Sequence, residues 1–222
     1  MPSLAPNVLV TDFDGTMTRR DFYDLVARQL LPVRTTDYWS EYRAGKITHF
    51  AALRGYFAAI RADEATVLQL VEQMEVDPQL AEAVAELRAH HWEIVVASAG
   101  CAWYIEHLLA EAGVTLEVHA NPGRFETGRG LLMEMPRNAP FNSPTHGIDK
   151  AAVVGHYKSQ GKQVAFAGDG FPDLQAAKLV PAALRFARGD LARELTAEGL
   201  GFRSFHTWSE IARELVARER LT

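Results

Sequence analysis

Short apolar runs alternate with helical patterns along most of the chain. The strongest runs, Val8–Thr11, Glu93–Ala97 and Gln163–Ala167, predict buried β-strands. Weaker runs at Leu116–His119 and Ala183–Phe186 predict two more strands. Because strands that alternate with helices form parallel sheets covered on both faces, the pattern predicts an α/β fold built on a parallel sheet.

The helical patterns between these strands carry recognisable ends. Asp77 followed by Pro78 is typical of a helix start, with an N-cap and a proline at the first helical position. Gly113 and Gly161 are typical of left-handed C-terminal caps. These signals predict helices over Gln79–His91, Trp103–Ala112 and Ile148–Gln160.

The segment 19–75 departs from the alternation, because it contains successive helical patterns and no convincing strand. Its apolar residues at helical spacing, which share one helix face, are Phe50, Leu53, Phe57 and Ile60. We therefore expect residues 1–18 and 76–222 to form the core and residues 19–75 to form a small helical cap inserted after the first strand.

A second insertion is predicted at Phe125–Pro136, where Gly128 and Gly130 interrupt short extended segments. This pattern indicates a β-hairpin. The proline-rich segment Pro136–Pro144 that follows predicts a loop.

Composition and charge exclude several classes of protein. The 222 residues are 48% hydrophobic and 23% charged, enough for one core of ordinary size with a smaller appendage. The net charge of −5 is spread along the chain, so we expect no nucleic-acid partner. A single cysteine and a start without signal-peptide features favour a cytoplasmic location. Apolar runs are too short to cross a membrane, so no membrane partner is expected.

Two acids follow the first predicted strand, at Asp12 and Asp14. Side chains two positions apart on an extended chain point the same way, so both carboxylates can face one site. That site would lie at the carboxyl edge of the sheet, where open parallel sheets bind ligands. The alternative is an ordinary Asp-Gly turn after a strand.

Two later strands also end in polar motifs. The hydroxyl of Ser98 and backbone amides up to Gly100 could hold phosphate oxygens at the start of the next helix. Glycines beside Asp169 would let the chain turn sharply next to a bound ion, which Asp169 could coordinate with support from Asp173. Without a function, Ser98 would simply form a turn or a helix cap. The second motif would be an ordinary helix N-terminus that carries acidic residues.

The order of the motifs decides between these alternatives. Lys150 alone is typical of a solvated surface lysine, but it stands between the serine motif and the second acid cluster. The acid pair, the serine and the acid cluster each stand at the end of a predicted strand. The series therefore indicates one site for a phosphate and a metal ion.

In this order the motifs resemble the haloacid dehalogenase superfamily, in particular its subfamily IB. That branch contains phosphoserine phosphatase and the methionine-salvage phosphatase for 2-hydroxy-3-keto-5-methylthiopentenyl-1-phosphate. The matching residues are Asp12-Phe13-Asp14-Gly15-Thr16, Ser98-Ala99-Gly100, Lys150, and Gly168-Asp169-Gly170 with Asp173. Segments 119–121 and 186–191 are also similar to the salvage enzyme, whereas 136–149 lacks its cysteine-rich segment. The resemblance covers nearly the whole chain and implies a Rossmann-like core with a cap.

The resemblance implies a Mg²⁺-dependent phosphatase that forms an aspartyl-phosphate on Asp12. The implied metal ligands are Asp12, the backbone carbonyl of Asp14, Asp169 and, directly or through water, Asp173. Asp14 would be the general acid and base, because two carboxylates in one site push their pKa values apart. Ser98 and Lys150 would complete the catalytic set by binding and neutralising the phosphate.

The cap is expected to select the substrate. Laid without gaps on the cap helix of phosphoserine phosphatases, His49 falls at a phenylalanine that helps close the site, and Tyr56 falls at the arginine that binds the substrate carboxylate. Without that arginine we expect a sugar, polyol or keto-enol phosphate to be preferred over phosphoserine. A shift in register could bring either Arg54 or Arg43 into the pocket. The other expected substrate contacts are Thr16, Asp21 and Gly100.

Other functions stay open at this point. The chain could be a phosphoserine phosphatase, a phosphotransferase or mutase that uses the same intermediate, or a non-catalytic module that binds a phosphorylated metabolite. The expected partner is a small phosphorylated metabolite, and the protein could be a monomer or a homodimer. Cys101, Trp103 and Tyr104 are expected to be packing residues.

Overall fold

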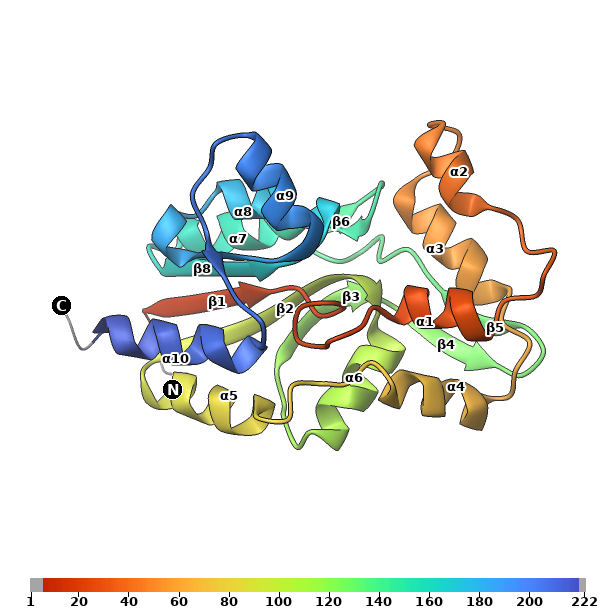
Figure 1. Ribbon diagram of the computed structural model, residues 1–222, viewed down its shortest axis with the longest axis horizontal. Helices are drawn as coiled ribbons and strands as arrows, with labels where there is room; N and C mark the ends of the chain where they lie inside the picture. The colour runs from red at the N-terminus through yellow and green to blue at the C-terminus, as the bar shows by residue number, and fades with distance from the viewer. Residues whose placement is uncertain (1–5, 220–222) are drawn as a thin grey trace.

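The core of the molecule is a parallel sheet flanked by helices (Figure 1). The computed structural model describes residues 6–219. Within these residues six strands pair in the order β10-β9-β8-β1-β2-β3, and every pair is parallel. The strands are β1 (Asn7–Thr11), β2 (Trp92–Cys101), β3 (Glu117–Asn121), β8 (Gln163–Gly168), β9 (Arg185–Ala187) and β10 (Arg203–Ser204). The predicted α/β fold is confirmed, while β10 was not predicted.

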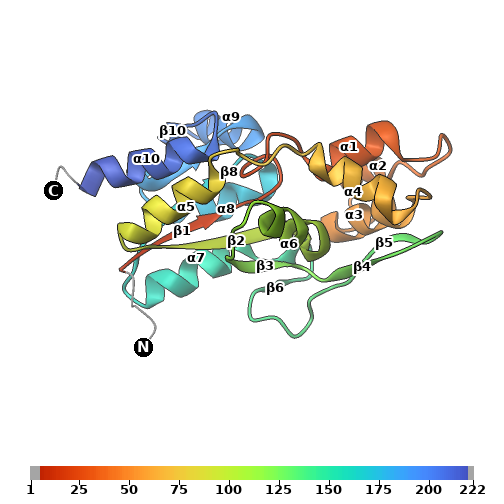
Figure 2. The ribbon, with the colours of Figure 1, turned by 90° about the horizontal axis from the view of Figure 1, so that it is seen from below.

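Helices cover both faces of the sheet (Figure 2). Because successive side chains of a strand point to opposite faces, Val8 and Val10 of β1 pack in one hydrophobic cluster and Leu9 packs in the other. The first cluster includes α7 (Lys150–Ser159), α8 (Leu174–Lys178) and α9 (Gly189–Ala197). The second includes α5 (Leu80–Ala89), α6 (Ala102–Glu111) and α10 (Trp208–Glu219). This three-layered arrangement is the Rossmann-like core that the resemblance implied.

Four helices lie beyond the carboxyl end of β1 and form the cap (Figure 1). They are α1 (Phe22–Gln29), α2 (Tyr38–Arg43), α3 (His49–Ala58) and α4 (Glu64–Glu72). The chain enters and leaves this part side by side, since Thr18 and Val76 form an antiparallel bridge. The four apolar residues predicted to share a face of the cap are all buried. No helix in the described part of the chain is long and apolar enough to span a membrane. The domain limits at residues 18 and 75 stay a prediction, and residues 1–5 and 220–222 of the expected core lie outside the described residues.

Two short hairpins join the core to the cap. The predicted hairpin is formed by β4 (Gly123–Glu126) and β5 (Gly130–Met133), and β5 packs against α3. A second, unpredicted hairpin is formed by β6 (Asn142–Ser143) and β7 (Gly147–Ile148), within and just after the segment expected to be a loop.

Several predicted element boundaries were wrong by a few residues. The helix expected from Ile148 begins at Lys150, because Ile148 pairs in β7 and the side chain of Asp149 caps the helix. The strand expected from Ala183 begins at Arg185, after a turn of 3₁₀ helix. The strand expected to end at Ala97 runs on to Cys101, with an irregular register that places the serine motif inside β2.

Asp77 bonds to the starts of two helices, but the prediction that it is the N-cap of the first was wrong. The expected helix begins at Leu80 with Gln79 at its N-cap position, and the Oδ1 atom of Asp77 accepts a hydrogen bond from the Gln79 amide at 2.9 Å. Its Oδ2 atom accepts another from the Ser209 amide, at the start of α10, at 2.7 Å. One buried carboxylate therefore ties α5 to α10, which pack against each other on the same face of the sheet.

We expect Asp77→Ala to lower the free energy of unfolding by about 1–3 kcal/mol, because one buried amide, of Ser209, and one partly buried amide, of Gln79, lose their acceptor. Urea unfolding followed by circular dichroism measures this change. Glu82→Ala is the matched control, since Glu82 is an exposed acid in the first turn of the same helix. The control should change stability by no more than about 0.5 kcal/mol. Equal effects of the two substitutions would contradict this account of Asp77.

Candidate active site

Three acids meet at the carboxyl edge of the sheet. β1 and β8 are parallel neighbours, so Asp12 and Asp169, which follow them, are brought side by side. Asp173 comes from the short 3₁₀ turn after Asp169. One carboxylate oxygen from each of these acids lies within 4.8 Å of the others. The structure thus brings together the three carboxylates expected to hold a metal.

Lys150 lies between two of these acids. Its Nζ atom is 2.8 Å from Oδ1 of Asp12 and 2.6 Å from Oδ1 of Asp173, and its side chain is almost fully buried. Oδ2 of Asp173 accepts hydrogen bonds from the amides of Asp169 at 3.0 Å and Gly170 at 2.9 Å. Burial lowers the pKa of Lys150, but the carboxylates of Asp12 and Asp173 outweigh it and raise that pKa above its usual value. Lys150 is therefore a fixed cation inside the site.

One ammonium does not balance the negative charge of the acids. Burial and the neighbouring carboxylates raise the pKa of Asp12 well above its usual value, against the opposing effect of Lys150. Burial and the charge of Asp173 likewise raise the pKa of Asp169 to about 7. A cluster of hard oxygen ligands with too little positive charge fits a divalent cation such as Mg²⁺. The Asp14 carboxylate is not part of this group, and the expected role of its backbone carbonyl stays a prediction.

The loop after Asp14 is packed tightly against Asp169. Gly15 has a φ of +65°, and a Cβ atom there would overlap the Asp169 carboxylate. The hydroxyl of Thr16 donates a hydrogen bond to Oδ1 of Asp169 at 3.1 Å. Thr16 therefore contacts the acid cluster, whereas its expected contact with the substrate stays a prediction.

The Asp14 carboxyl group bonds to α6 and to the start of the cap. Its Oδ2 atom accepts a hydrogen bond from the Tyr104 hydroxyl at 2.8 Å, and its Oδ1 atom accepts one from the Phe22 amide at 3.2 Å. Burial and the charge of Asp12 raise the pKa of Asp14 to about 6, although these hydrogen bonds oppose the shift. A carboxyl group that titrates near neutrality suits a general acid and base.

Hydrogen bonds hold the serine motif, residues 98–100, in place at the end of β2. The hydroxyl oxygen of Ser98 accepts a hydrogen bond from the Gly100 amide at 2.9 Å, and the side chain of Asn121 donates one to the Ala99 carbonyl at 2.7 Å. Gly100 has no space for a Cβ atom, which would overlap the Tyr104 hydroxyl. Cys101, beside the motif, is buried, and burial raises the pKa of its thiol to about 12, as suits a packing residue.

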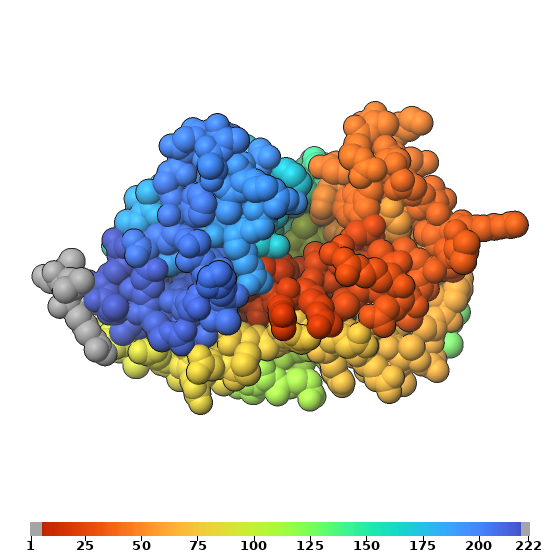
Figure 3. All heavy atoms as spheres, in the orientation of Figure 1, coloured from red at the N-terminus to blue at the C-terminus, as the bar shows by residue number. Residues whose placement is uncertain are grey.

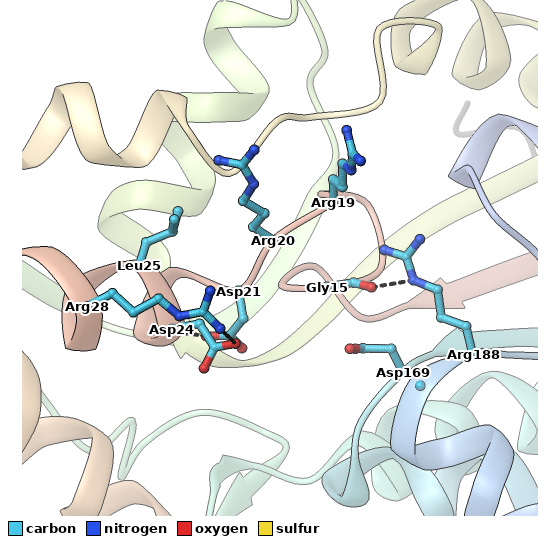
Figure 4. Close-up of a pocket in the computed structure, with 10 residues that line it drawn as sticks. Gly15, Arg19, Arg20, Asp21, Asp24, Leu25, Arg28, Asp169 and Arg188 are labelled. Carbon is cyan, nitrogen blue, oxygen red and sulfur yellow. Dashed lines mark hydrogen bonds and ion pairs between the residues drawn. The ribbon is translucent and has the colours of Figure 1, made fainter.

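A cavity of about 360 Å³ opens between the cap and the core beside Asp169. Figure 3 shows the surface hollowed between the cap helices and the C-terminal part of the core. Asp21, Asp24 and Arg28 line it from the cap, while Asp169 and Arg188 line it from the core (Figure 4). Burial and the charge of Asp14 raise the pKa of Asp21 to about 7. Of the cap residues expected to bind the substrate, Asp21 is the one that lines this cavity.

His49 lies at the start of α3, where the cap meets the β6–β7 hairpin. The amide of the next residue, Phe50, donates a hydrogen bond to the Thr145 carbonyl at 2.8 Å. The His49 ring packs between Trp39, at 5.2 Å, and His146, at 5.1 Å between ring centroids. Its Nδ1 atom is buried without a hydrogen-bond partner among the described residues. Burial, then His146 and Lys150, lower the pKa of His49 to about 3, so the ring is neutral.

Tyr56 and Arg54 do not line the cavity that contains Asp169. The Tyr56 hydroxyl accepts a hydrogen bond from the Trp39 amide at 3.0 Å and donates one to Asp37 at 3.3 Å, within the cap. Arg54 is exposed, lies over the Phe50 ring, and lines a second cavity of about 340 Å³ near β5. Their expected contacts with the substrate stay predictions.

Two residues at the site were missed by the sequence analysis. Tyr104 was expected only to pack, yet it contacts Asp14; its place one helical turn after Gly100 was the available signal. Arg188 follows β9 and donates hydrogen bonds to the carbonyls of Gly15 at 2.6 Å and Thr18 at 2.7 Å. Its position after a predicted strand, at the same edge of the sheet, could have identified it.

Comparisons with known proteins agree with this arrangement. The family model for haloacid dehalogenase-like hydrolases matches residues 9–178. A 2-hydroxy-3-keto-5-methylthiopentenyl-1-phosphate phosphatase of Microcystis aeruginosa (strain NIES-843 / IAM M-2473) is 24% identical, over 96% of this chain and 99% of its own. One from Brevibacillus brevis (strain 47 / JCM 6285 / NBRC 100599) is 25% identical, over 90% of this chain and 91% of its own.

Solved structures show the same fold. A substrate-bound phosphoserine phosphatase has a TM-score of 0.63 to this chain at 17% identity, covering 95% of this chain and 97% of its own. The family model extends from β1 to α8 and includes all four motifs. The chain therefore belongs to the family of haloacid dehalogenase-like hydrolases, the family and the class of enzyme that its motifs predicted.

Proposed function

We propose that this phosphatase is Mg²⁺-dependent and hydrolyses a small phosphorylated metabolite through an aspartyl-phosphate on Asp12. The observation that supports this most is the buried Lys150, held between Asp12 and Asp173 beside Asp169. A phosphate ester repels nucleophiles through its anionic oxygens, so the site must collect positive charge around a fixed nucleophile. Lys150 supplies that charge next to the proposed nucleophile.

The metal would be held by Asp12, Asp169 and Asp173, together with the backbone carbonyl of Asp14. When bound, Mg²⁺ would offset the negative charge that the phosphate adds to the acids. The raised pKa values of Asp12 and Asp169 support this assignment, because burial and then the neighbouring carboxylates disfavour the charged form of each acid, and a bound cation would oppose both effects.

In the first step, a carboxylate oxygen of Asp12 attacks phosphorus and the bond from phosphorus to the leaving oxygen breaks. Oδ1 of Asp12 already accepts hydrogen bonds from Lys150 and from the Phe13 amide, so we expect Oδ2 to attack. Asp14 gives its proton to the leaving oxygen. Ser98 and nearby amides would bind the phosphate oxygens.

In the second step, Asp14 takes a proton from water, and the water oxygen attacks the phosphorus of the aspartyl-phosphate. The bond between phosphorus and Asp12 breaks, which releases inorganic phosphate and regenerates both carboxyl groups. A phosphotransferase would differ only here, by passing the phosphoryl group to a second substrate.

For the organic part of the substrate we propose a hydroxylated, uncharged body, as in a sugar, polyol or keto-enol phosphate. Each arginine that lines the cavity beside Asp169 already has a partner. The pairs are Arg19 and Arg20 with Glu75, Arg28 with Asp24, and Arg188 with backbone carbonyls. Asp21 would accept a hydrogen bond from a substrate hydroxyl. The relatives that act on a keto-enol phosphate support this class, and phosphoserine is the alternative.

Phosphate release should be greatest with a sugar, polyol or keto-enol phosphate, and phosphoserine should not lead. The test compares kcat/KM across these compounds, phosphoserine and nucleotides, without an added acceptor. A kcat/KM for phosphoserine that is tenfold higher than for the other compounds would contradict the proposed substrate class. This ratio corresponds to a difference of about 1.4 kcal/mol in transition-state free energy. Turnover that requires an acceptor alcohol would favour the phosphotransferase.

Chelation of divalent ions should abolish hydrolysis, and added Mg²⁺ should restore it, because Lys150 alone does not balance three carboxylates and a phosphate. The measurement is turnover of the best substrate with and without excess chelator. Circular dichroism of the chelated protein is the control for unfolding. Undiminished turnover in excess chelator would contradict the metal assignment.

Asp12→Asn should reduce turnover to less than about 1% of the wild-type rate, because an amide is a poor nucleophile. Asp63→Asn is the matched control. Asp63 is the N-cap residue of helix α4, and asparagine is also a good N-cap residue. The control should keep wild-type turnover within about twofold. An Asp12→Asn variant that keeps substantial activity would exclude covalent catalysis by Asp12.

A further inference from the structure

Tyr104 contacts the proposed general acid, although it belongs to none of the four motifs. It lies on α6, its side chain is buried, and its hydroxyl donates the 2.8 Å hydrogen bond to Oδ2 of Asp14. The packing of the Tyr104 ring in the core does not require this hydrogen bond. An aromatic ring of the same size without a hydroxyl would fill the space equally well.

The second hydrogen bond to Asp14 comes from the cap. Phe22 is the first residue of α1, and its amide donates to Oδ1 of Asp14 at 3.2 Å. Its ring packs against the Tyr104 ring with centroids 4.5 Å apart, and against Phe57 of α3 at 5.3 Å. Both residues that donate to Asp14 therefore belong to one cluster of aromatic rings, which packs between the core and the cap.

These two hydrogen bonds fix the plane of the Asp14 carboxyl group. A carboxylate offers about four lone-pair sites on its two oxygens, so one donor at each oxygen leaves a second site free. The free sites can face a leaving oxygen or a water molecule, while rotation of the group is blocked. A correctly oriented acid removes an entropic part of the barrier to proton transfer.

The serine motif makes room for this contact. A Cβ atom on Gly100 would overlap the Tyr104 hydroxyl and would come within 2.7 Å of Oδ2 of Asp14. The glycine that closes the phosphate-binding motif thus also lets the tyrosine and the aspartate meet. Three separate parts of the chain, the serine motif, α6 and the start of α1, converge on the Asp14 carboxyl group.

We propose that Tyr104 is a positioning residue that orients Asp14 for proton transfer to the leaving oxygen, with the start of the cap as the second support. The proposal rests on the function proposed above, in which Asp14 is the general acid. Its consequence is specific, because proton donation matters more as the leaving oxygen becomes more basic. Loss of the Tyr104 hydroxyl should slow reactions of basic leaving groups and spare those of acidic ones.

The test is the Tyr104→Phe variant, which keeps the ring and removes only the hydroxyl. We would measure kcat/KM, which reports the step that expels the leaving group, with aryl phosphates from p-nitrophenyl to phenyl phosphate. We expect a loss of less than about threefold for p-nitrophenyl phosphate and of about tenfold or more for phenyl phosphate. The same loss with every substrate would overturn the proposal and indicate a structural role.

Tyr157→Phe is the matched control. Tyr157 lies on α7, in the hydrophobic cluster on the opposite face of the sheet from Tyr104. The substitution removes a tyrosine hydroxyl that donates a hydrogen bond to Glu117 at 3.1 Å. This variant should leave the dependence on the leaving group unchanged. Urea unfolding of both variants checks that each is folded under the assay conditions.

A double-mutant cycle with Asp14→Asn shows whether Tyr104 acts through Asp14. With phenyl phosphate, Tyr104→Phe should cause little further loss once Asp14 is asparagine, because the group that it positions is gone. Losses that multiply would overturn the proposal. A wild-type enzyme that hydrolyses no phosphomonoester would instead overturn the proposed function, so the two failures are distinguishable.

Discussion

The buried ammonium group of Lys150 is the interaction on which the rest of the site depends. Carboxylates do not enter a protein interior unless they are paired and hydrogen-bonded. Asp173, which is fully buried, meets that condition through Lys150 and two backbone amides, and Asp12 meets it through Lys150 and its neighbouring amide. The lysine therefore favours the charged form of Asp12, the proposed nucleophile, and holds it in place, while the acids around it leave a local excess of negative charge that suits a cation.

The site is assembled from two sides. The sheet supplies the proposed nucleophile and the acid cluster, since the parallel register of β1 and β8 fixes where Asp12 and Asp169 lie. The cap and α6 supply the surroundings of Asp14, through Phe22 and Tyr104. One hydrophobic cluster runs from the sheet through α6 into the cap helices, so the proposed acid is oriented by the same packing that holds the cap on the core.

The sequence predicted the sheet and the motif residues because these depend on local patterns. Apolar runs mark strands, and residues that follow parallel strands must meet at one edge. The sequence did not reveal the hydrogen-bond partners of polar side chains, since Tyr104 and Asp14 are brought together only by the tertiary fold. The same limit applies in the cap, where a gap-free alignment placed Tyr56 at a ligand position and could not show that its hydroxyl bonds to Trp39 and Asp37. Short elements such as β6 and β7 were missed because two residues carry no periodicity.

The central claim is that Asp12 becomes covalently phosphorylated during turnover. The most direct measurement is to quench the enzyme in acid during hydrolysis, reduce the acyl phosphate with borohydride, and map the peptides by mass spectrometry. Borohydride converts an aspartyl-phosphate to homoserine and leaves a free carboxylate unchanged. We predict homoserine at position 12 only when substrate is present. Unmodified Asp12 in a sample that is turning over, or homoserine at another aspartate, would contradict it.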